Sequence, residues 1–207
     1  MIKIATSILS SKDRIKSIKE LNNTSTDYIH IDAMDNIFVP NYQLPLNEVN
    51  ELGHFSNKPF DIHLMMEDPE PYIKGLNINN VDAITIHLEI NKDVDKLINT
   101  IKSLGCKVGL AIKPKTDIDL INKYIDNIDK VIIMSVEPGF GGQKFISESI
   151  NRIKEIRTKR NDIIIEVDGG INDETIKAID TIADIAVVGS YITNNDNYQE
   201  AINNLKN

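Results

Sequence analysis

Eight short apolar segments rich in β-branched residues recur along the chain, and they constrain its fold more than any other feature. They cover residues 2–5, 28–31, 60–64, 83–87, 107–112, 131–134, 163–167 and 185–188. Between them lie segments of helical spacing, the clearest with apolar residues three or four apart at positions 94–104 and 150–156. Nearly continuous apolar strands, each followed by an amphipathic helix, predict a parallel sheet covered on both faces.

The number of strand–helix units favours a closed barrel. Eight units in 207 residues predict an α/β fold, a single (β/α)₈ TIM barrel, with residues 1–207 in one domain. An internal repeat agrees with a closed barrel, because an aspartate precedes every second predicted strand, roughly 50 residues apart. These residues are Asp27, Asp82, Asp129 and Asp184. An open dinucleotide-binding sheet is disfavoured, since it requires a Gly-rich turn where residues 5–9 read ATSIL.

Composition excludes some partners and leaves others open. The net charge of −8 does not indicate a nucleic-acid partner, although backbone N–H groups can still bind a phosphorylated metabolite. The single cysteine, Cys106, cannot form an internal disulfide. The first residues do not resemble a signal peptide, and no apolar run reaches the roughly 18–20 residues that span a bilayer. We therefore expect a cytoplasmic protein without a membrane partner.

Polar side chains stand at the carboxyl ends of three predicted strands, where a (β/α)₈ barrel carries its chemistry. His30 and Asp32 are two residues apart and share one face of a strand, while His63 and Asp168 end two other strands. Each alone could be a hydrogen-bonded residue of the barrel rim. Together, two imidazoles and two carboxylates predict a site for zinc, iron(II) or manganese(II). His54 lies between strands and is expected at the surface.

Small residues form three loops beyond the last three strands. The first is 137–144, with Gly139, Gly141 and Gly142; the others contain Gly169-Gly170 and Gly189-Ser190. Plain turns are one interpretation. A phosphate-binding cradle is favoured, because glycines expose backbone N–H groups and this fold commonly binds phosphate after these strands.

Three methionines, Met34, Met65 and Met134, also follow strand ends. Ordinary core packing is the simpler interpretation of this flexible apolar side chain. If these residues line the mouth of the barrel, they would exclude water above a planar intermediate.

Four stretches of this sequence closely resemble the ribulose-phosphate 3-epimerase family, and the similarity extends along essentially the entire chain. They are residues 28–35 together with 38–41, 61–65, 136–143 and 165–170. The resemblance implies an isomerase of carbohydrate metabolism that acts in the pentose phosphate pathway. The implied reaction epimerises D-ribulose 5-phosphate to D-xylulose 5-phosphate at C3. A homo-oligomer, either a dimer or a hexamer, is also implied.

The resemblance further implies how the site works. One divalent ion per subunit (Zn²⁺, Fe²⁺, Mn²⁺ or Co²⁺) would be held by His30, Asp32, His63 and Asp168. It would polarise the ketone, whose neighbouring proton is otherwise too weakly acidic, and stabilise an enediolate. Asp32 and Asp168 would serve as the acid and the base. The implied substrate and phosphate contacts are Ser7, His63, Gly139, Phe140, Gly141, Gly142, Asp168, Gly169, Gly170, Gly189 and Ser190, and Met34, Met65 and Met134 match the family's active-site cap.

Several positions depart from the family pattern. Thr6 replaces a proline, Asn36 replaces a glycine, and the residue before Pro45 is not the usual glycine. Asn36 can adopt positive φ, so its turn is expected to survive. Glycines are also missing near Thr26, Val81 and Ala183, which should affect stability rather than chemistry.

Two alternatives stay open. A 3-epimerase for a hexulose 6-phosphate, such as allulose 6-phosphate, would keep every catalytic residue. A barrel that binds phosphate without catalysis is disfavoured, because buried carboxylates without a metal partner would be costly.

Overall fold

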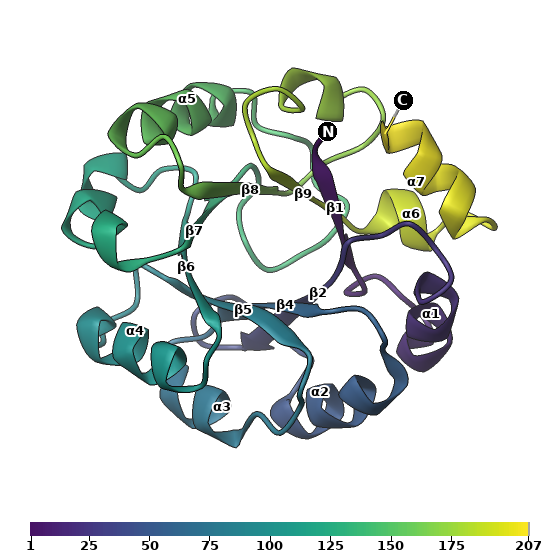
Figure 1. Cartoon of the computed structure of the whole chain (residues 1–207), viewed down its shortest axis with the longest axis horizontal. Coiled ribbons are helices and arrows are strands. Elements are labelled where there is room, and N and C mark those ends of the chain that lie inside the picture. Colours follow the sequence, from purple (N-terminus) through teal and green to yellow (C-terminus); the bar gives the residue numbers. More distant parts are fainter. Residues whose placement is uncertain (207) are drawn as a thin grey trace.

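Eight parallel strands close into a barrel in the computed structural model, which describes residues 1–206 (Figure 1). The barrel strands are β1 (Lys3–Ser7), β2 (Tyr28–Asp35), β4 (Phe60–Met65), β5 (Val81–His87), β6 (Lys107–Ile112), β7 (Lys130–Met134), β8 (Ile164–Asp168) and β9 (Ile185–Val188). Strand β1 pairs in parallel with both β9 and β2, which joins the two ends of the sheet. The predicted (β/α)₈ TIM barrel is thus confirmed.

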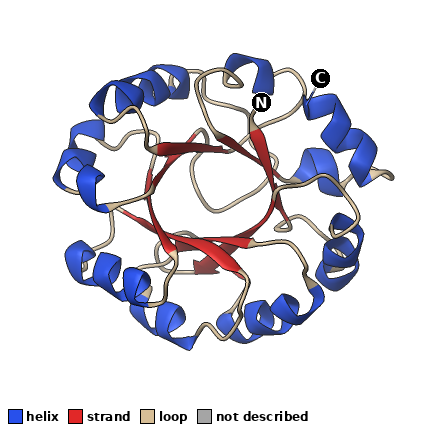
Figure 2. Cartoon of the chain, in the orientation of Figure 1, coloured by secondary structure: helices blue, strands red, loops and turns tan. Residues whose placement is uncertain are grey.

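Helices surround this barrel on its outer side (Figure 2). The α-helices are α1 (Arg14–Leu21), α2 (Leu46–Leu52), α3 (Glu70–Gly75), α4 (Val94–Ser103), α5 (Ser149–Lys159), α6 (Ser190–Thr193) and α7 (Tyr198–Lys206). Asp13 and Asp93 cap α1 and α4 by accepting the N–H groups of Lys16 and Lys96. Helices α4 and α5 form at the two apolar spacings that predicted them, with Leu104 as the C-cap of α4. None of the helices within residues 1–206 combines the length and apolar character needed to span a membrane.

Two strand connections differ from the predicted pattern, because they contain 3₁₀ helices instead of an α-helix. The 3₁₀ helices are η1 (Gly53–Phe55), η2 (Ile118–Lys123), η3 (Ile125–Asn127) and η4 (Ile176–Ala178); η2 and η3 join β6 to β7, and η4 lies between β8 and β9. Ile118 and Ile121 are buried three residues apart, and so are Ile176 and Ile179. This spacing fits the three residues per turn of a 3₁₀ helix. His54, in η1, is exposed, and its predicted place at the surface is confirmed.

The repeated aspartates have a shared structural task at three of their four positions. The carboxylates of Asp27, Asp129 and Asp184 each accept a backbone N–H from the start of the adjacent barrel strand, at 2.8–2.9 Å. Asp82 instead pairs with Lys107 Nζ at 2.9 Å, beside a register shift between β4 and β5. The repeated aspartates therefore reflect the way in which alternate strands are aligned at the bottom of the barrel.

A short strand that the sequence did not predict extends β2 beyond the barrel. Strand β3 (Tyr42–Gln43) runs antiparallel to the end of β2. The turn between them contains Asn36 at φ 61°, so the expected positive φ at this non-glycine residue is confirmed. Leu44 follows at φ 48°, directly before Pro45. Positive φ costs a leucine about 1–2 kcal/mol, an amount comparable to the gain from burying its side chain completely.

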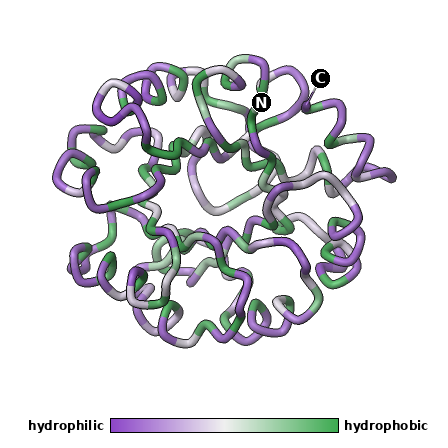
Figure 3. The backbone as a smooth tube through the Cα atoms, viewed as in Figure 1, coloured by the Kyte–Doolittle hydropathy of each residue, from purple (hydrophilic) through white to green (hydrophobic). Residues whose placement is uncertain are grey.

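The barrel wall and the barrel interior have different chemistry. Hydrophobic positions lie along the strands and hydrophilic ones around the rim of helices (Figure 3). Inside the barrel, however, the ammonium group of Lys130 is buried against the carboxylates of Asp61 and Glu166, with 2.8 Å between Lys130 Nζ and Glu166 Oε2. This ion network was not predicted from the sequence.

Replacing Lys130 with methionine should destabilise the protein strongly, because the substitution leaves Asp61 buried without its cation. The expected loss in the free energy of unfolding, measured by urea denaturation, is about 3–5 kcal/mol. Lys92→Met is the matched control, since Lys92 pairs with Asp68 at an exposed position; its loss should stay below about 1 kcal/mol. Equal losses in the two variants would show that the buried network does not stabilise the barrel.

Candidate metal and active site

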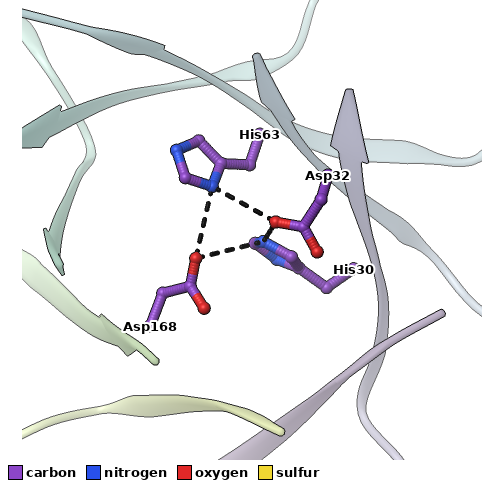
Figure 4. A group of neighbouring side chains, drawn as sticks. All are labelled: His30, Asp32, His63 and Asp168. Carbon is purple, nitrogen blue, oxygen red and sulfur yellow. Dashed lines mark ion pairs between the residues drawn. The ribbon is translucent and has the colours of Figure 1, made fainter. Parts of the chain in front are cut away.

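Four side chains meet inside the mouth of the barrel (Figure 4). His30 and Asp32 come from β2, His63 from β4, and Asp168 from the last residue of β8. Residues two apart on β2 face the same side, and the parallel register sets Asp32 opposite His63. The structure therefore brings together all four residues that the sequence predicted as metal ligands.

The ligand atoms of these four side chains form a compact cluster. Asp32 Oδ1 lies 3.4 Å from His30 Nε2 and 3.6 Å from His63 Nδ1. Asp168 Oδ2 lies 3.4 Å from His63 Nδ1 and 4.0 Å from His30 Nε2. Four ligands around an ion with bonds of about 2.1 Å would be separated by about 3.4 Å in a tetrahedral site, close to these four separations, and all the ligand atoms lie within 4.8 Å of one another.

The two imidazoles also present unsatisfied nitrogens to the centre of the cluster. His30 Nε2 and His63 Nδ1 are buried and have no hydrogen-bond partner. Leaving such atoms unpaired is costly, unless a positive ion occupies the space between them and the carboxylates. The donor set and its orphaned nitrogens fit a divalent transition metal.

Neighbouring side chains fix two of the candidate ligands. Ser7 donates its hydroxyl hydrogen to Asp32 Oδ2 at 2.6 Å, which leaves Oδ1 directed at the cluster. Behind His30, its Nδ1 lies 2.9 Å from Asp61 Oδ2, and a carboxylate there favours a proton on Nδ1. Both contacts hold the ligand atoms in place.

The electrostatics of the site reflect its excess of buried carboxylates. Burial by itself would lower the pKa of His30, but Asp32 and Asp61 outweigh this effect and hold the pKa well above its usual value. Burial would raise the pKa of Asp32, yet the charges of His30 and His63 hold it below the usual range. Deeper in the barrel, burial and the charge of Asp61 raise the pKa of Glu166 to about 8. The site thus favours a positive charge at its centre.

A cavity of about 310 Å³ opens above the cluster. Asp32 and Asp168 line its floor, whereas His30 and His63 are fully buried beneath it. Every residue predicted to contact the substrate lines this cavity, except His63: Ser7, Gly139, Phe140, Gly141, Gly142, Asp168, Gly169, Gly170, Gly189 and Ser190. Ser10, Asn172 and Tyr191 also line it and were not predicted.

The three methionines belong to the cavity wall as well as to the packed interior. Met34, Met65 and Met134 all line the cavity, and each side chain is nearly inaccessible to solvent. Met34 and Met65 pack with Val39, and Met134 packs with Val136. Both interpretations offered by the sequence, core packing and lining of the mouth, therefore apply to the same side chains.

The glycines of the cavity rim are required by backbone shape and by lack of space. Gly139, Gly142, Gly169 and Gly170 have positive φ between 65° and 123°. A Cβ on Gly170 would lie 2.4 Å from the backbone nitrogen of Phe145, and one on Gly169 would lie 2.4 Å from Val136. Neighbouring residues pack so closely against Gly169 and Gly170 that only glycine fits at both positions.

Two departures from the family pattern contact each other. Thr6, which stands in place of a proline, lies 2.7 Å from Thr26 through their hydroxyl oxygens, and both side chains are buried. The Thr26 hydroxyl also contacts the carbonyls of Ile4 and Tyr28. Both buried hydroxyls therefore have a hydrogen-bond partner, and these contacts do not reach the metal cluster.

Residues behind the ligands were missed by sequence reasoning. They are Asp61, Lys130 and Glu166 under His30, and His87 with Glu89 behind His63. A signal was present, because Asp61 and His63, Glu166 and Asp168, and His87 and Glu89 are polar pairs spaced by two residues near strand ends. The pairing of each residue across the barrel was not visible in the sequence.

Comparisons with known proteins show what this chain is similar to. A model of the ribulose-phosphate 3 epimerase family matches residues 3–193. The ribulose-phosphate 3-epimerase of Bacillus subtilis (strain 168) is 36% identical over 214 residues, covering 100% of this chain and 99% of that protein. Its counterpart in Escherichia coli (strain K12) is 33% identical over 215 residues, covering 98% and 94%. KGPDC from Streptococcus mutans has a TM-score of 0.75 at 15% identity, covering 100% of this chain and 96% of that one, which shows a shared fold.

Proposed function

The chain is an enzyme that belongs to the ribulose-phosphate 3-epimerase family, and from this premise we propose that it interconverts D-ribulose 5-phosphate and D-xylulose 5-phosphate. The conversion inverts C3 by moving protons between the substrate and two carboxylates. The observation that carries the mechanism is the cluster of His30, Asp32, His63 and Asp168, with its two orphaned nitrogens beneath an open cavity.

These four residues would hold one divalent cation, Zn²⁺, Fe²⁺, Mn²⁺ or Co²⁺. When bound, such a cation polarises the C2 carbonyl and stabilises the charge that develops on its oxygen as the C3 proton leaves. The protein supplies the ligand geometry through Ser7 on Asp32 and through Asp61 on His30. Ligands held in this way need little rearrangement when the cation binds.

Asp32 and Asp168 would carry the protons. Inversion at one carbon requires a base on one face of the substrate and an acid on the other, and the two groups exchange roles in the reverse direction. The two carboxylates come from different strands, β2 and β8, and both line the floor of the cavity. A substrate bound between them would therefore present opposite faces of C3 to the two residues.

The cavity walls would exclude water and bind the phosphate. Met34, Met65 and Met134 provide an apolar cap over the reacting carbons, where water would otherwise add protons without stereocontrol. Backbone N–H groups of the loops at Gly141-Gly142, Gly169-Gly170 and Gly189-Ser190 would hold the phosphate. We also propose a homo-oligomer, supported by the exposed apolar side chains of Ile37 and Tyr42 beside the mouth.

A direct comparison of three substrates tests this function. The metal-loaded enzyme should convert ribulose 5-phosphate much faster than unphosphorylated ribulose, because the loops provide binding energy only to the phosphate. We expect kcat/KM to fall at least about 100-fold for ribulose, as expected from the loss of about 3 kcal/mol of binding. The assay follows xylulose 5-phosphate formation with a coupled enzyme and free xylulose formation by chromatography.

Allulose 6-phosphate is the control for the competing hexulose function. The proposed function requires kcat/KM for ribulose 5-phosphate to exceed that for allulose 6-phosphate. A preference for the hexulose phosphate would reassign the substrate while leaving the reaction type intact. Comparable turnover of ribulose and ribulose 5-phosphate would instead contradict the phosphate role of the glycine loops.

A further inference from the structure

Two polar residues outside the cavity wall lie directly behind His63. His87, the last residue of β5, has its Nε2 2.9 Å from His63 Nε2, and both rings are fully buried. On its other side, His87 Nδ1 lies 3.0 Å from Glu89 Oε2. His63, His87 and Glu89 thus form a continuous chain of hydrogen bonds that leads away from the candidate metal site.

The far end of this hydrogen-bond chain is anchored by two groups that donate to Glu89, one of which, a backbone N–H, can only donate. The backbone N–H of Lys113 donates to Glu89 Oε1 at 2.7 Å, and the Thr116 hydroxyl also contacts Oε1. These contacts fix Oε1 toward the loop after β6 and leave Oε2 to face His87. The orientation of the carboxylate is therefore set by the loop after β6 and not by the metal site.

When both imidazole rings are neutral, the hydrogen bonds allow only one pair of tautomers for His87 and His63. A carboxylate accepts only, so His87 must carry its proton on Nδ1 and present Nε2 as an acceptor. His63 must then donate from its Nε2, which leaves the lone pair on its Nδ1. That Nδ1 is the buried atom without a partner, and it faces Asp32 and Asp168 at 3.6 and 3.4 Å.

We propose that His87 and Glu89 are positioning residues that fix the tautomer of His63, so that its Nδ1 lone pair points at the metal. This inference rests on the proposed metal site. The two imidazole ligands are then oriented in different ways. His30 is held directly by the carboxylate of Asp61, whereas His63 is held through a second imidazole, that of His87.

The substitution Glu89→Gln keeps the shape of the side chain but reverses the direction of the hydrogen bonds from residue 89 through His87 to His63. The amide oxygen must face the Lys113 N–H, so the amide nitrogen faces His87 and donates to Nδ1. His87 then carries its proton on Nε2 and donates to His63, which must move its own proton to Nδ1. The lone pair that should bind the metal is lost in this tautomer, so metal binding requires breaking the chain.

The test measures metal affinity and the tautomer of His63 in the purified full-length chain. Zinc binding, measured by competition with a chromophoric chelator, should weaken about 10- to 100-fold in Glu89→Gln. Nitrogen-15 spectra of the metal-free protein, at alkaline pH where the rings are neutral, should place the His63 proton on Nε2 in the wild type. In Glu89→Gln the same proton should be on Nδ1.

Three further proteins complete the design. Glu67→Gln is the matched control, because Glu67 also accepts a loop N–H, that of Asn91, but does not belong to the hydrogen-bond chain behind His63. The zinc affinity of this variant should equal that of the wild type. His87→Gln offers an amide oxygen to His63 Nε2 and should retain more affinity than His87→Leu, which offers no acceptor. If the zinc affinity of His87→Gln exceeds that of His87→Leu, the effect comes from the position of the His63 proton and not from lost packing.

The outcomes distinguish this proposal from the proposed function. If the wild type binds no divalent metal, the metal-dependent mechanism itself fails. If the wild type binds zinc and Glu89→Gln binds it equally well with an unchanged His63 tautomer, only the positioning role is overturned. The positioning role is supported if Glu89→Gln loses affinity together with a shifted His63 proton while Glu67→Gln changes neither.

Discussion

Asp168→Asn is expected to lower the turnover of ribulose 5-phosphate by about 100- to 10,000-fold, and Asp32→Asn should have an effect of the same size. Asparagine keeps the shape of each side chain but cannot carry a proton, and a positioned acid or base contributes a rate factor of this magnitude. Both residues line the cavity floor, and the other lining residues include no carboxylate that could take over their role. The measurement is steady-state kcat in the coupled assay with each variant.

Loss of metal alone could mimic this result, because both residues are also proposed ligands. Each variant is therefore reloaded with metal, and its metal content is measured together with its activity. Asp173→Asn is the matched control, since Asp173 is exposed and lies five residues beyond Asp168; its turnover should stay near that of the wild type. Near-normal activity of metal-loaded Asp168→Asn would show that Asp168 serves as a ligand only.

Removal of the metal should abolish activity almost completely. Without a cation, the C2 carbonyl loses the charge stabilisation that makes its neighbouring proton removable, an effect of several kcal/mol that corresponds to at least about a 1,000-fold loss. Activity should return when Mn²⁺, Fe²⁺, Co²⁺ or Zn²⁺ is added to the metal-free protein. The measurement is activity against metal content, determined by elemental analysis during chelation and reloading.

Circular dichroism of the metal-free protein is the control, because unfolding would also remove activity. The barrel has an extensive buried core outside the cluster, so the secondary structure should persist without metal. Full activity in protein verified as metal-free would remove the metal from the mechanism. The cluster would then require another cation, such as a proton on His30, to balance its carboxylates.

The barrel could be predicted from the sequence because its strands are locally distinctive. Each strand is a short apolar run, and buried parallel strands require little other information to be identified. The connections were harder to predict, since a spacing of three residues, as between Ile176 and Ile179, fits an α-helix as well as a 3₁₀ helix. Only the backbone hydrogen bond from the Ile179 N–H to the Ile176 carbonyl shows the 3₁₀ turn. Strand β3 was missed because its two residues carry no periodic signal.

The metal ligands were predictable for a similar reason. The closed barrel brings strand ends into one mouth, so polar residues at those ends must converge even though they are far apart in sequence. The interior network was not predictable, because Lys130 and Asp61 lie near the starts of β7 and β4, away from the mouth, and meet only across the barrel. A lysine at the start of a strand ordinarily indicates solvent, and only closure places Lys130 inside.

Proton exchange at C3 tests the central claim most directly, namely that Asp32 and Asp168 act on opposite faces of the substrate. Metal-loaded wild type, Asp32→Asn and Asp168→Asn are incubated in deuterated water with each epimer separately, and deuterium at C3 is followed by NMR. The proposed mechanism predicts that each variant exchanges the proton of only one epimer, a different one in each variant, and that neither interconverts them efficiently. Near-normal interconversion by metal-loaded Asp168→Asn would contradict it, because another group would then deliver the second proton.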